Sequence, residues 1–479
     1  MTYERVLDLF KEISRVPRGS GNPDSIAAFV KDFAEKAGCY AEVDDVKNVF
    51  VRKKAATGWE DRPTIIFQGH MDMVCAADEG VEHDFLKDPI EFIEDGTGWI
   101  YAPGTTLGAD DGLGCAMMLG LIEDRSPSGQ LEFIFTTDEE TNMTGAQSFD
   151  CKKLTGKYLL NLDNEEEGVM IVSSAGISDL RMHIPYEKLK KGDPSIVIPL
   201  YKISVDGFQG GHSGIDINLP RLNAVQVITQ IIEKLSTLEG FVLYSVTAGS
   251  HMNAIPKSAS VLFAGVLPED ISSWLSDREA ELKKIEPDAR VHLTQDKKTG
   301  PLTPYTEEGV QTLIRLVRSL DHGVLAMDEA VEGLVQTSVN LARLVEAEDD
   351  FEIWSCFRSS VDDAMIQGRQ KLEKIAADFG GHLESAFFET GWARNDHSRL
   401  VPYVVDCYRE ALGEAPKVEG IHAGLECGRW SRGIPDADLI SMGPTLVHPH
   451  TTGERAELAS LEKYVRLLNR IVEKANVLK

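Results

Sequence analysis

The sequence predicts an α/β protein with a mixed, mostly parallel sheet. Three short apolar runs, at residues 65–70, 131–136 and 158–162, are typical of fully buried strands. Helical patterns alternate with strand patterns along the chain, which favours a parallel sheet covered on both faces. Each of the three runs leads into polar or acidic residues. Those residues are therefore expected at the carboxyl edge of the sheet, where open α/β sheets place their sites.

The elements of the first third follow from the spacing of apolar residues. Val6, Leu9, Phe10 and Ile13 recur at helical spacing and predict an amphipathic helix. After a turn region at 17–23, Asp24 or Ser25 can cap a second helix. Next we expect a strand over 43–51, the buried strand from residue 65, a loop with a short hairpin over 75–104, a helix over 113–124, and strands at 131–136 and 158–162.

The pattern changes after Ser173. Residues 183–200 are rich in Lys and Pro and are interpreted as a hinge or exposed loop. A second α/β pattern follows, with strands expected at 203–205, 260–266, 290–294 and 351–357 and helices at 222–235, 269–285 and 364–379. Beyond residues 391–392 the chain returns to helices, at 400–412 and 458–477, around short Gly-rich loops. At 479 residues the chain is long enough for two or three domains.

Charge and composition exclude several classes of partner. The chain has 49 Lys+Arg and 77 Asp+Glu, so its net charge is 49 − 77 = −28. This acidity argues against nucleic acids or anionic membranes as binding partners. The seven cysteines are scattered without a C-x-x-C pair, which indicates reduced, intracellular thiols. The N-terminus lacks the apolar core of a signal peptide. The sequence also lacks a run of about 18 apolar residues, which a membrane span would need. We therefore expect a cytoplasmic protein.

His70 and Asp72 stand at the end of the strand that begins at Ile65. Residues i and i+2 of an extended chain point to the same side, so the two side chains are expected together. A carboxylate beside an imidazole fixes its tautomer and raises its basicity, as a metal-ligating histidine requires. The alternative is a core histidine satisfied by its neighbour.

Three further stretches place acids at the ends of elements. Asp110 and Asp111 lie where a loop enters a helix, and capping is the alternative interpretation. Glu139 and Glu140 follow a buried strand directly; adjacent residues point in opposite directions, so the two can have different roles, and a solvated acidic loop is the alternative. Asp163 ends another strand, and the acids at 165–167 beyond it are expected on the solvated surface.

A distant loop, 443–450, carries His448 and His450. Together these stretches supply His, Asp, Glu, Asp and His. Mixed imidazole and carboxylate ligands suit zinc, or else manganese or cobalt. Five ligands are too many for one tetrahedral zinc with an open position, and they suit two zincs about 3.5–4 Å apart that share one carboxylate.

The chain resembles the M20-type metallopeptidases, and within them the aminoacyl-histidine dipeptidases. The matching stretches are Gln-Gly-His-Met-Asp-Met-Val at 68–74, Thr-Thr-Leu-Gly-Ala-Asp at 105–110, Asp-Glu-Glu at 138–140, Asn-Leu-Asp at 161–163, Gly-Gly-His-Ser-Gly at 210–214, Asn-Ala-Ile-Pro at 253–256, Ile-His-Ala-Gly-Leu-Glu-Cys-Gly at 421–428 and Pro-His at 449–450. They span most of the chain in the family's order, so they are specific jointly.

The resemblance implies a role for each metal-site residue. Asp110 would bridge two Zn²⁺ ions (or Mn²⁺ or Co²⁺), with His70 and Asp163 completing one site and Glu140 and His450 the other. Asp72 would orient His70, and Glu139 would be the general base. The peptide bond after the bridging aspartate is often cis in the family; here it joins Asp110 to Asp111. Relatives usually have asparagine at position 111, and alignment with Leu-Gly-Ala-Asp favours Asp110 as the bridge.

The resemblance also implies substrate-binding residues. His212 would stabilise the oxyanion, usually from the partner subunit, and Asn253 and Arg358 are candidates for binding the terminal carboxylate of the substrate. A turn asparagine and a surface salt bridge are the alternatives for the last two. Glycines around Glu426 suggest a tight loop that lines the pocket.

The implied architecture is a zinc-exopeptidase-like catalytic domain formed by 1–176 and 389–479. An inserted α+β lid and dimerisation domain, 177–388, would interrupt it.

The implied function is hydrolysis of dipeptides, of Xaa-His type such as β-alanyl-histidine, by metal-activated water in a homodimer. Alternatives are a tripeptidase, an acyl-amino-acid deacylase, or a non-catalytic binding protein on the same scaffold; the intact Glu139 and complete ligand set argue against the last. A serine hydrolase is not favoured, because residues 211–214 do not form a G-x-S-x-G elbow.

Overall fold

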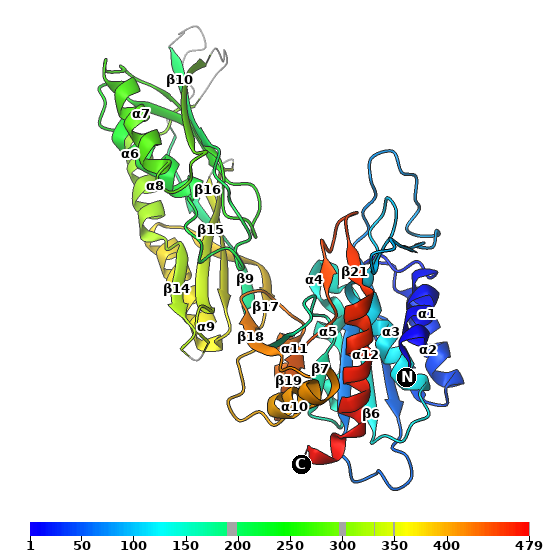
Figure 1. Ribbon diagram of the computed structural model, residues 1–479. Coiled ribbons are helices and arrows are strands. Elements are labelled where there is room, and N and C mark those ends of the chain that lie inside the picture. Colours follow the sequence, from blue (N-terminus) through cyan, green and yellow to red (C-terminus); the bar gives the residue numbers. More distant parts are fainter. Residues whose placement is uncertain (189–198, 297–302, 330, 348–349, 479) are drawn as a thin grey trace. The chain divides into compact units, whose positions relative to one another are not determined.

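The computed structural model describes residues 1–188, 199–296, 303–329, 331–347 and 350–478 (Figure 1). The chain forms two compact units. Unit 1 comprises Met1–Ser173, Trp392–Gly420 and Leu425–Lys479, and unit 2 comprises Ser174–Gly391 with the short segment Ile421–Gly424. The predicted α/β class with mixed sheets is confirmed.

Unit 1 contains an eight-stranded sheet in the order β1-β2-β6-β3-β7-β19-β8-β18. Its strands are β1 (Tyr40–Val43), β2 (Val49–Lys53), β3 (Ile65–His70), β6 (Leu131–Thr136), β7 (Tyr158–Asn161), β8 (Val169–Ser174), β18 (Lys417–Ile421) and β19 (Asp438–Ser441). The central strand β3 is parallel to β6 and β7, and β7 is parallel to β19, whereas β1, β2 and β8 run antiparallel to a neighbour. The parallel centre brings the carboxyl ends of β3, β6 and β7 to one edge.

Helices and a small second sheet complete unit 1. The helices are α1 (Tyr3–Ser14), α2 (Asp24–Lys36), α3 (Ala109–Glu123), α4 (Glu139–Asn142), α5 (Thr144–Ser148), α10 (Leu400–Leu412), α11 (Cys427–Gly433) and α12 (Leu458–Glu473), with 3-10 turns at Cys151–Lys153 and Ala475–Val477. The second sheet has the order β20-β21-β5-β4, from β4 (Ile93–Glu94), β5 (Trp99–Tyr101), β20 (Leu446–Val447) and β21 (Arg455–Glu457).

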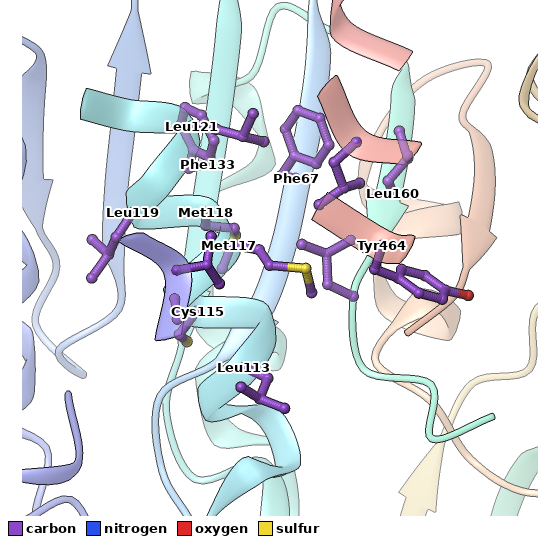
Figure 2. Close-up of a cluster of buried hydrophobic side chains, with 14 of the residues drawn as sticks. Phe67, Leu113, Cys115, Met117, Met118, Leu119, Leu121, Phe133, Leu160 and Tyr464 are labelled. Carbon is purple, nitrogen blue, oxygen red and sulfur yellow. The ribbon is translucent and has the colours of Figure 1, made fainter. Parts of the chain in front are cut away.

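The core of unit 1 lies between α3 and the centre of the sheet. Figure 2 draws a buried cluster that contains α3 side chains from Leu113 to Leu121 together with Phe67 of β3, Phe133 of β6 and Tyr464 of α12. The α3 residues from 109 to 122 are all buried, so this helix is enclosed on every face. Phe67 and Phe133 stack with their ring centroids 5.7 Å apart. This packing fixes both α3 and the strand ends that carry the acids.

Unit 2 is built on a nine-stranded antiparallel sheet, ordered β13-β10-β12-β11-β15-β16-β9-β17 with β14 beside β15. Its strands are β9 (Gly176–Pro185), β10 (Leu200–Asp206), β11 (Val242–Ala248), β12 (Ala259–Ala264), β13 (Arg290–Asp296), β14 (Gly323–Met327), β15 (Val335–Glu346), β16 (Asp350–Ser359) and β17 (His382–Glu389). Helices α6 (Ala224–Leu235), α7 (Ile271–Leu282), α8 (Glu307–Ser319) and α9 (Asp362–Asp378) complete this unit.

Some local predictions were wrong. Residues 43–51 hold the end of β1 and most of β2, because a turn at 44–48 separates two strands that pair with each other. Residues 183–185 belong to β9, since β16 and β17 pair on both sides of it; most of the supposed hinge, 189–198, lies outside the described residues. Neither Asp24 nor Ser25 caps α2, because the helix begins at Asp24 after Pro23. In the described part of the chain, no helix combines the length and apolarity needed to cross a membrane.

Candidate functional site

Five predicted ligands meet at the carboxyl edge of the unit 1 sheet. His70 is the last residue of β3, Glu140 is the second residue of α4 just after β6, and Asp163 follows β7 by two residues. These strands are parallel neighbours, so their ends are adjacent. Asp110 enters from the start of α3, and His450 from the loop between β20 and β21, where it adopts a positive φ of 61°.

Asp110 lies between the two histidines. Its Oδ1 is 3.0 Å from Nε2 of His70, and its Oδ2 is 3.0 Å from Nε2 of His450. Nε2 of His70 also lies 3.3 Å from Oδ1 of Asp163, and Nε2 of His450 lies 3.0 Å from Oε2 of Glu140. Each imidazole thus faces one oxygen of Asp110 and one oxygen of a second carboxylate.

The electrostatics of this cluster favour positive charge beside Asp110. Burial alone would raise the pKa of Asp110, but hydrogen bonds with His450 and His70 outweigh it and lower that pKa. Hydrogen bonds to Asp110 and Glu140 raise the pKa of His450 to about 11. Burial lowers the pKa of His70, yet Asp163 and Asp110 raise it well above its ordinary value. The pocket therefore stabilises cations near both imidazoles.

The donor set fits divalent metal ions. His70, Asp110 and Glu140 form one group of possible ligand atoms within 4.8 Å of one another, and Asp110, Glu165 and His450 form a second. Buried carboxylates in excess of nearby cationic side chains are costly unless a cation compensates them. One carboxylate with an oxygen toward each imidazole matches a bridging ligand between two ions.

Asp72 connects His70 to the acidic turn after β6. Its Oδ1 is 3.5 Å from Nδ1 of His70 and accepts a hydrogen bond from the backbone N–H of Glu139 at 3.1 Å. Its Oδ2 accepts hydrogen bonds from the backbone N–H of Glu140 at 3.4 Å and from the Ser20 hydroxyl at 2.7 Å. One carboxylate therefore fixes both the imidazole and the backbone that carries the two glutamates.

Glu139 and Glu426 are carboxyls with raised pKa values. Burial raises the pKa of Glu139 to about 8; His70 opposes this, and the Glu426 and Glu140 carboxylates add to it. Burial likewise raises the pKa of Glu426 to about 7. Glu426 is fully buried and accepts a hydrogen bond from Thr136 Oγ1 at 2.8 Å. Both groups can thus exchange protons near neutral pH.

The peptide bond between Asp110 and Asp111 is cis, as the resemblance implied. Asp111 makes different contacts: its Oδ1 accepts a hydrogen bond from the backbone N–H of Gly114 at 3.1 Å, and its carboxylate lies against Gly69. Of the acids that the structure describes, Asp110 alone lies within ion-pair distance of both His70 and His450, so the geometry favours Asp110 over Asp111 as the shared ligand.

The remaining predicted residues are Arg358, His212 and Asn253, which belong to unit 2. Arg358 lies on β16, is 3% exposed, and donates from Nε and Nη2 to the Ser213 hydroxyl, both at 3.2 Å. Its Nη2 is 3.5 Å from Nε2 of His212. The Asn253 carbonyl accepts a hydrogen bond from the backbone N–H of Ser213 at 2.8 Å, and the Asn253 residue is exposed. Within the described residues, no carboxylate lies within ion-pair distance of Arg358 and its Nη1 has no partner.

Three histidines of unit 2 are held in the neutral form. Burial lowers the pKa of His322 to about 4. Burial, helped by Arg358, lowers the pKa of His212 to about 4 and that of His422 to about 3. Nδ1 of His212 accepts hydrogen bonds from two backbone N–H groups, and Nδ1 of His322 accepts one, which requires these nitrogens to be unprotonated.

The free energy of unfolding is therefore expected to fall as pH decreases below about 6.5. In the unfolded chain these histidines take up protons near their ordinary pKa of about 6.5, so the stability that neutral burial provides is present above that pH and is lost toward pH 4. Urea unfolding between pH 4 and 7 measures the slope. His322→Gln should make the slope shallower by about 1 kcal/mol per pH unit; an unchanged slope would show that His322 is not buried in its neutral form.

One residue of the site was missed. The acids at 165–167 were expected on the surface, but Glu165 joins Asp110 and His450 as a possible ligand. Burial raises the pKa of Glu165 to about 7, and the Asp110 carboxylate adds to this. The run of three glutamates does not distinguish Glu165 from its neighbours in the sequence, because Glu165 is enclosed only by the distant loop between β20 and β21, which carries His450.

The chain is similar in sequence and structure to known peptidases. The sequence model of Peptidase family M20/M25/M40 matches residues 66–474. The chain is 30% identical to the cytosol non-specific dipeptidase of Escherichia coli (strain K12) over 473 residues, which is 97% of this chain and 96% of that protein. The structure of aminoacylhistidine dipeptidase from Vibrio alginolyticus superposes with a TM-score of 0.87 at 30% identity, covering 98% of this chain and 96% of that chain. Aminopeptidase PepT from Bacillus cereus ATCC 10987 shares the fold, with a TM-score of 0.57 at 18% identity and full coverage of both chains.

Proposed function

Since the chain belongs to peptidase family M20/M25/M40 and is an enzyme with metallo-dipeptidase homologues, we propose that it uses two divalent cations to hydrolyse the peptide bond of dipeptides. The observation that carries this proposal is the position of Asp110, with one carboxylate oxygen 3.0 Å from each of two imidazoles. A carboxylate so placed suits a shared ligand between two ions.

His70 and Asp163 would hold one cation and Glu140 and His450 the other, with Asp110 shared. Zinc suits this mixed set of nitrogen and oxygen ligands, and manganese or cobalt are the alternatives. When bound, such a pair of cations supplies Lewis-acid activation of water and of the scissile carbonyl. Asp72 would orient His70 and raise its basicity toward the metal.

Glu139 would act as the general base. It takes a proton from the attacking water and passes it to the leaving amine. Burial raises its pKa to about 8, close to the pH at which a base works best, and nearby cations would oppose this rise. The backbone hydrogen bond from Glu139 to Asp72 fixes the start of α4, so the carboxylate needs little reorganisation. Glu426, buried beside Thr136, would line the same pocket.

Arg358, His212 and Asn253 would bind the carboxylate of the substrate and the developing oxyanion. A buried guanidinium without an acidic partner is unfavourable unless a ligand supplies the charge. Its planar fork suits a carboxylate, and His212 is neutral and adjacent to it.

Arg358→Lys is expected to raise KM for dipeptides by about 10- to 100-fold, because lysine loses the bidentate pair while keeping the charge. Steady-state kinetics on a dipeptide and on its C-terminal amide measure the effect. The C-terminal amide has no carboxylate for Arg358 to bind, so KM for the amide should differ little between the Arg358→Lys enzyme and the unaltered enzyme. Equal losses on both substrates would contradict a carboxylate-binding role. Arg369→Lys, exposed on α9, is the matched control.

Unit 2 would serve as lid and dimerisation domain, between catalytic segments 1–176 and 389–479. Support for a homodimer comes from the edge strand β14, whose Val324, Leu325 and Met327 are exposed. Beside it lies a cavity of about 380 Å³, lined largely by apolar side chains of β14, β15, β16 and α9. Exposed apolar edge strands are typical association surfaces. Sedimentation velocity would give the mass of the particle. A cytoplasmic location is part of the same proposal.

Xaa-His dipeptides such as β-alanyl-histidine are the proposed substrates, supported by the similarity to an aminoacylhistidine dipeptidase. The test is a panel of dipeptides, tripeptides and acyl-amino acids, each assayed with zinc, manganese and cobalt. Preference for dipeptides supports the proposal. Preference for tripeptides or acyl-amino acids would favour a tripeptidase or a deacylase of the same fold, and no hydrolysis of any substrate would indicate a non-catalytic binding protein.

A further inference from the structure

Glu454 is a buried carboxylate that binds four consecutive backbone N–H groups. It is 2% exposed and lies four residues after His450. Its two oxygens accept hydrogen bonds from the N–H groups of residues 107 to 110, with N···O distances of 2.8, 2.9, 2.7 and 3.3 Å in that order. An ionised carboxylate has about four lone-pair sites, so this loop uses its full accepting capacity.

The loop at 107–110 has the shape that such an anion requires. Gly108 adopts a positive φ of 66°, which turns successive N–H groups toward one side and forms an anion-binding concavity. A Cβ atom on Gly108 would lie 2.6 Å from Nη2 of Arg18 and 2.7 Å from Sδ of Met73, so space as well as conformation calls for glycine. The chain's own Glu454 occupies this concavity, and the loop ends in Asp110.

Arg18 holds the opposite side of the same loop. It is 2% exposed, and its Nη2 donates a hydrogen bond to the carbonyl of Gly108. Its Nη1 donates to the carbonyls of Met71 and Asp72, at 2.9 and 3.0 Å. The loop is thus bound by a carboxylate on its N–H groups and by a guanidinium on a carbonyl. The same guanidinium binds the chain directly after His70.

We propose that Glu454 and Arg18 are positioning residues that hold Asp110 in register with His70 and His450. Glu454 links the Asp110 loop to the loop of His450, and Arg18 links it to the end of β3. Among the described residues, the hydrogen bonds of both side chains go to backbone groups and not to the side chain of a proposed metal ligand. The inference rests on the proposed function, because it assumes that cations bind at Asp110.

Glu454→Gln in the full-length chain tests this. The amide keeps the size of the side chain but turns an NH₂ group toward two of the four N–H donors. We expect the dissociation constant for Zn²⁺, measured by competition with a chromophoric chelator, to rise by about 10- to 100-fold, the usual effect of losing a partner behind a metal ligand. The absorption spectrum of the Co²⁺-loaded chain should change as well. Glu462→Gln, exposed on α12, also removes one carboxylate and should bind as the unaltered chain does.

The melting temperature of the metal-free chain separates positioning from a merely structural role. A variant that melts earlier but binds Zn²⁺ with unchanged affinity overturns the inference. If Glu454→Gln does not fold, Arg18→Lys decides, since one ammonium group cannot reproduce the fork that joins Gly108 to residues 71 and 72: weaker binding supports the inference, and unchanged binding overturns it. An unaltered chain that binds no divalent cation would overturn the proposed function, and this inference with it.

Discussion

Glu139→Gln is expected to lower kcat for dipeptide hydrolysis by about 10²- to 10⁴-fold, the usual contribution of a general base. Glutamine keeps the volume and the backbone hydrogen bond to Asp72 but cannot take a proton. Because Glu139 is not among the proposed ligands, the metal content should stay at two ions per chain. Steady-state kinetics together with elemental analysis of the dialysed variant measure both quantities.

Glu166→Gln is a suitable control for Glu139→Gln, because it removes an exposed carboxylate of unit 1 and should leave kcat unchanged. A Glu139→Gln enzyme with full activity would show that another group takes the proton, and Glu426 would then be the first candidate, since its pKa of about 7 suits the task. A variant that has lost its metal would instead assign Glu139 to the ligand set.

Asp110→Asn is expected to reduce hydrolysis to background. It should also weaken metal binding by more than the about 10- to 100-fold that results from losing a residue that supports a metal ligand without binding the metal. The amide can still contact one cation through its oxygen, but its NH₂ group faces the other histidine. Chelation of the unaltered chain should likewise abolish hydrolysis, and added Zn²⁺, Mn²⁺ or Co²⁺ should restore it. Competition with a chelator and kinetics after back-titration measure these effects.

Asp111→Asn is the matched control for Asp110→Asn. Its side-chain oxygen can still accept the hydrogen bond from the Gly114 backbone N–H, so we expect metal binding to survive. If Asp111→Asn lost metal and Asp110→Asn kept it, the shared ligand would be Asp111. Hydrolysis that is indifferent to chelators would contradict the metal-dependent mechanism as a whole.

Local patterns predicted much of unit 1 correctly. The residues that pack α1 against the core were the apolar positions at helical spacing, and the three continuous apolar runs became β3, β6 and β7. These signals are strong because burial on one or both faces leaves a regular trace in the sequence. Unit 2 was predicted less completely: β9, β11, β14, β15, β17 and α8 were missed. β14 and β17 are largely exposed, so their sequences show little contrast between apolar and polar positions.

Residue identity and local spacing were enough to predict the strand ends, the acids that follow them and, through the resemblance, the set of five candidate ligands. Three features became visible only in the folded chain: which carboxylate faces both imidazoles, that Glu165 joins them, and that Arg358 is buried beside His212 with no acidic partner among the described residues. It also revealed the four hydrogen bonds from residues 107–110 to Glu454. Contacts between residues that are distant in the sequence depend on how strands and loops pack, and no local pattern records that packing.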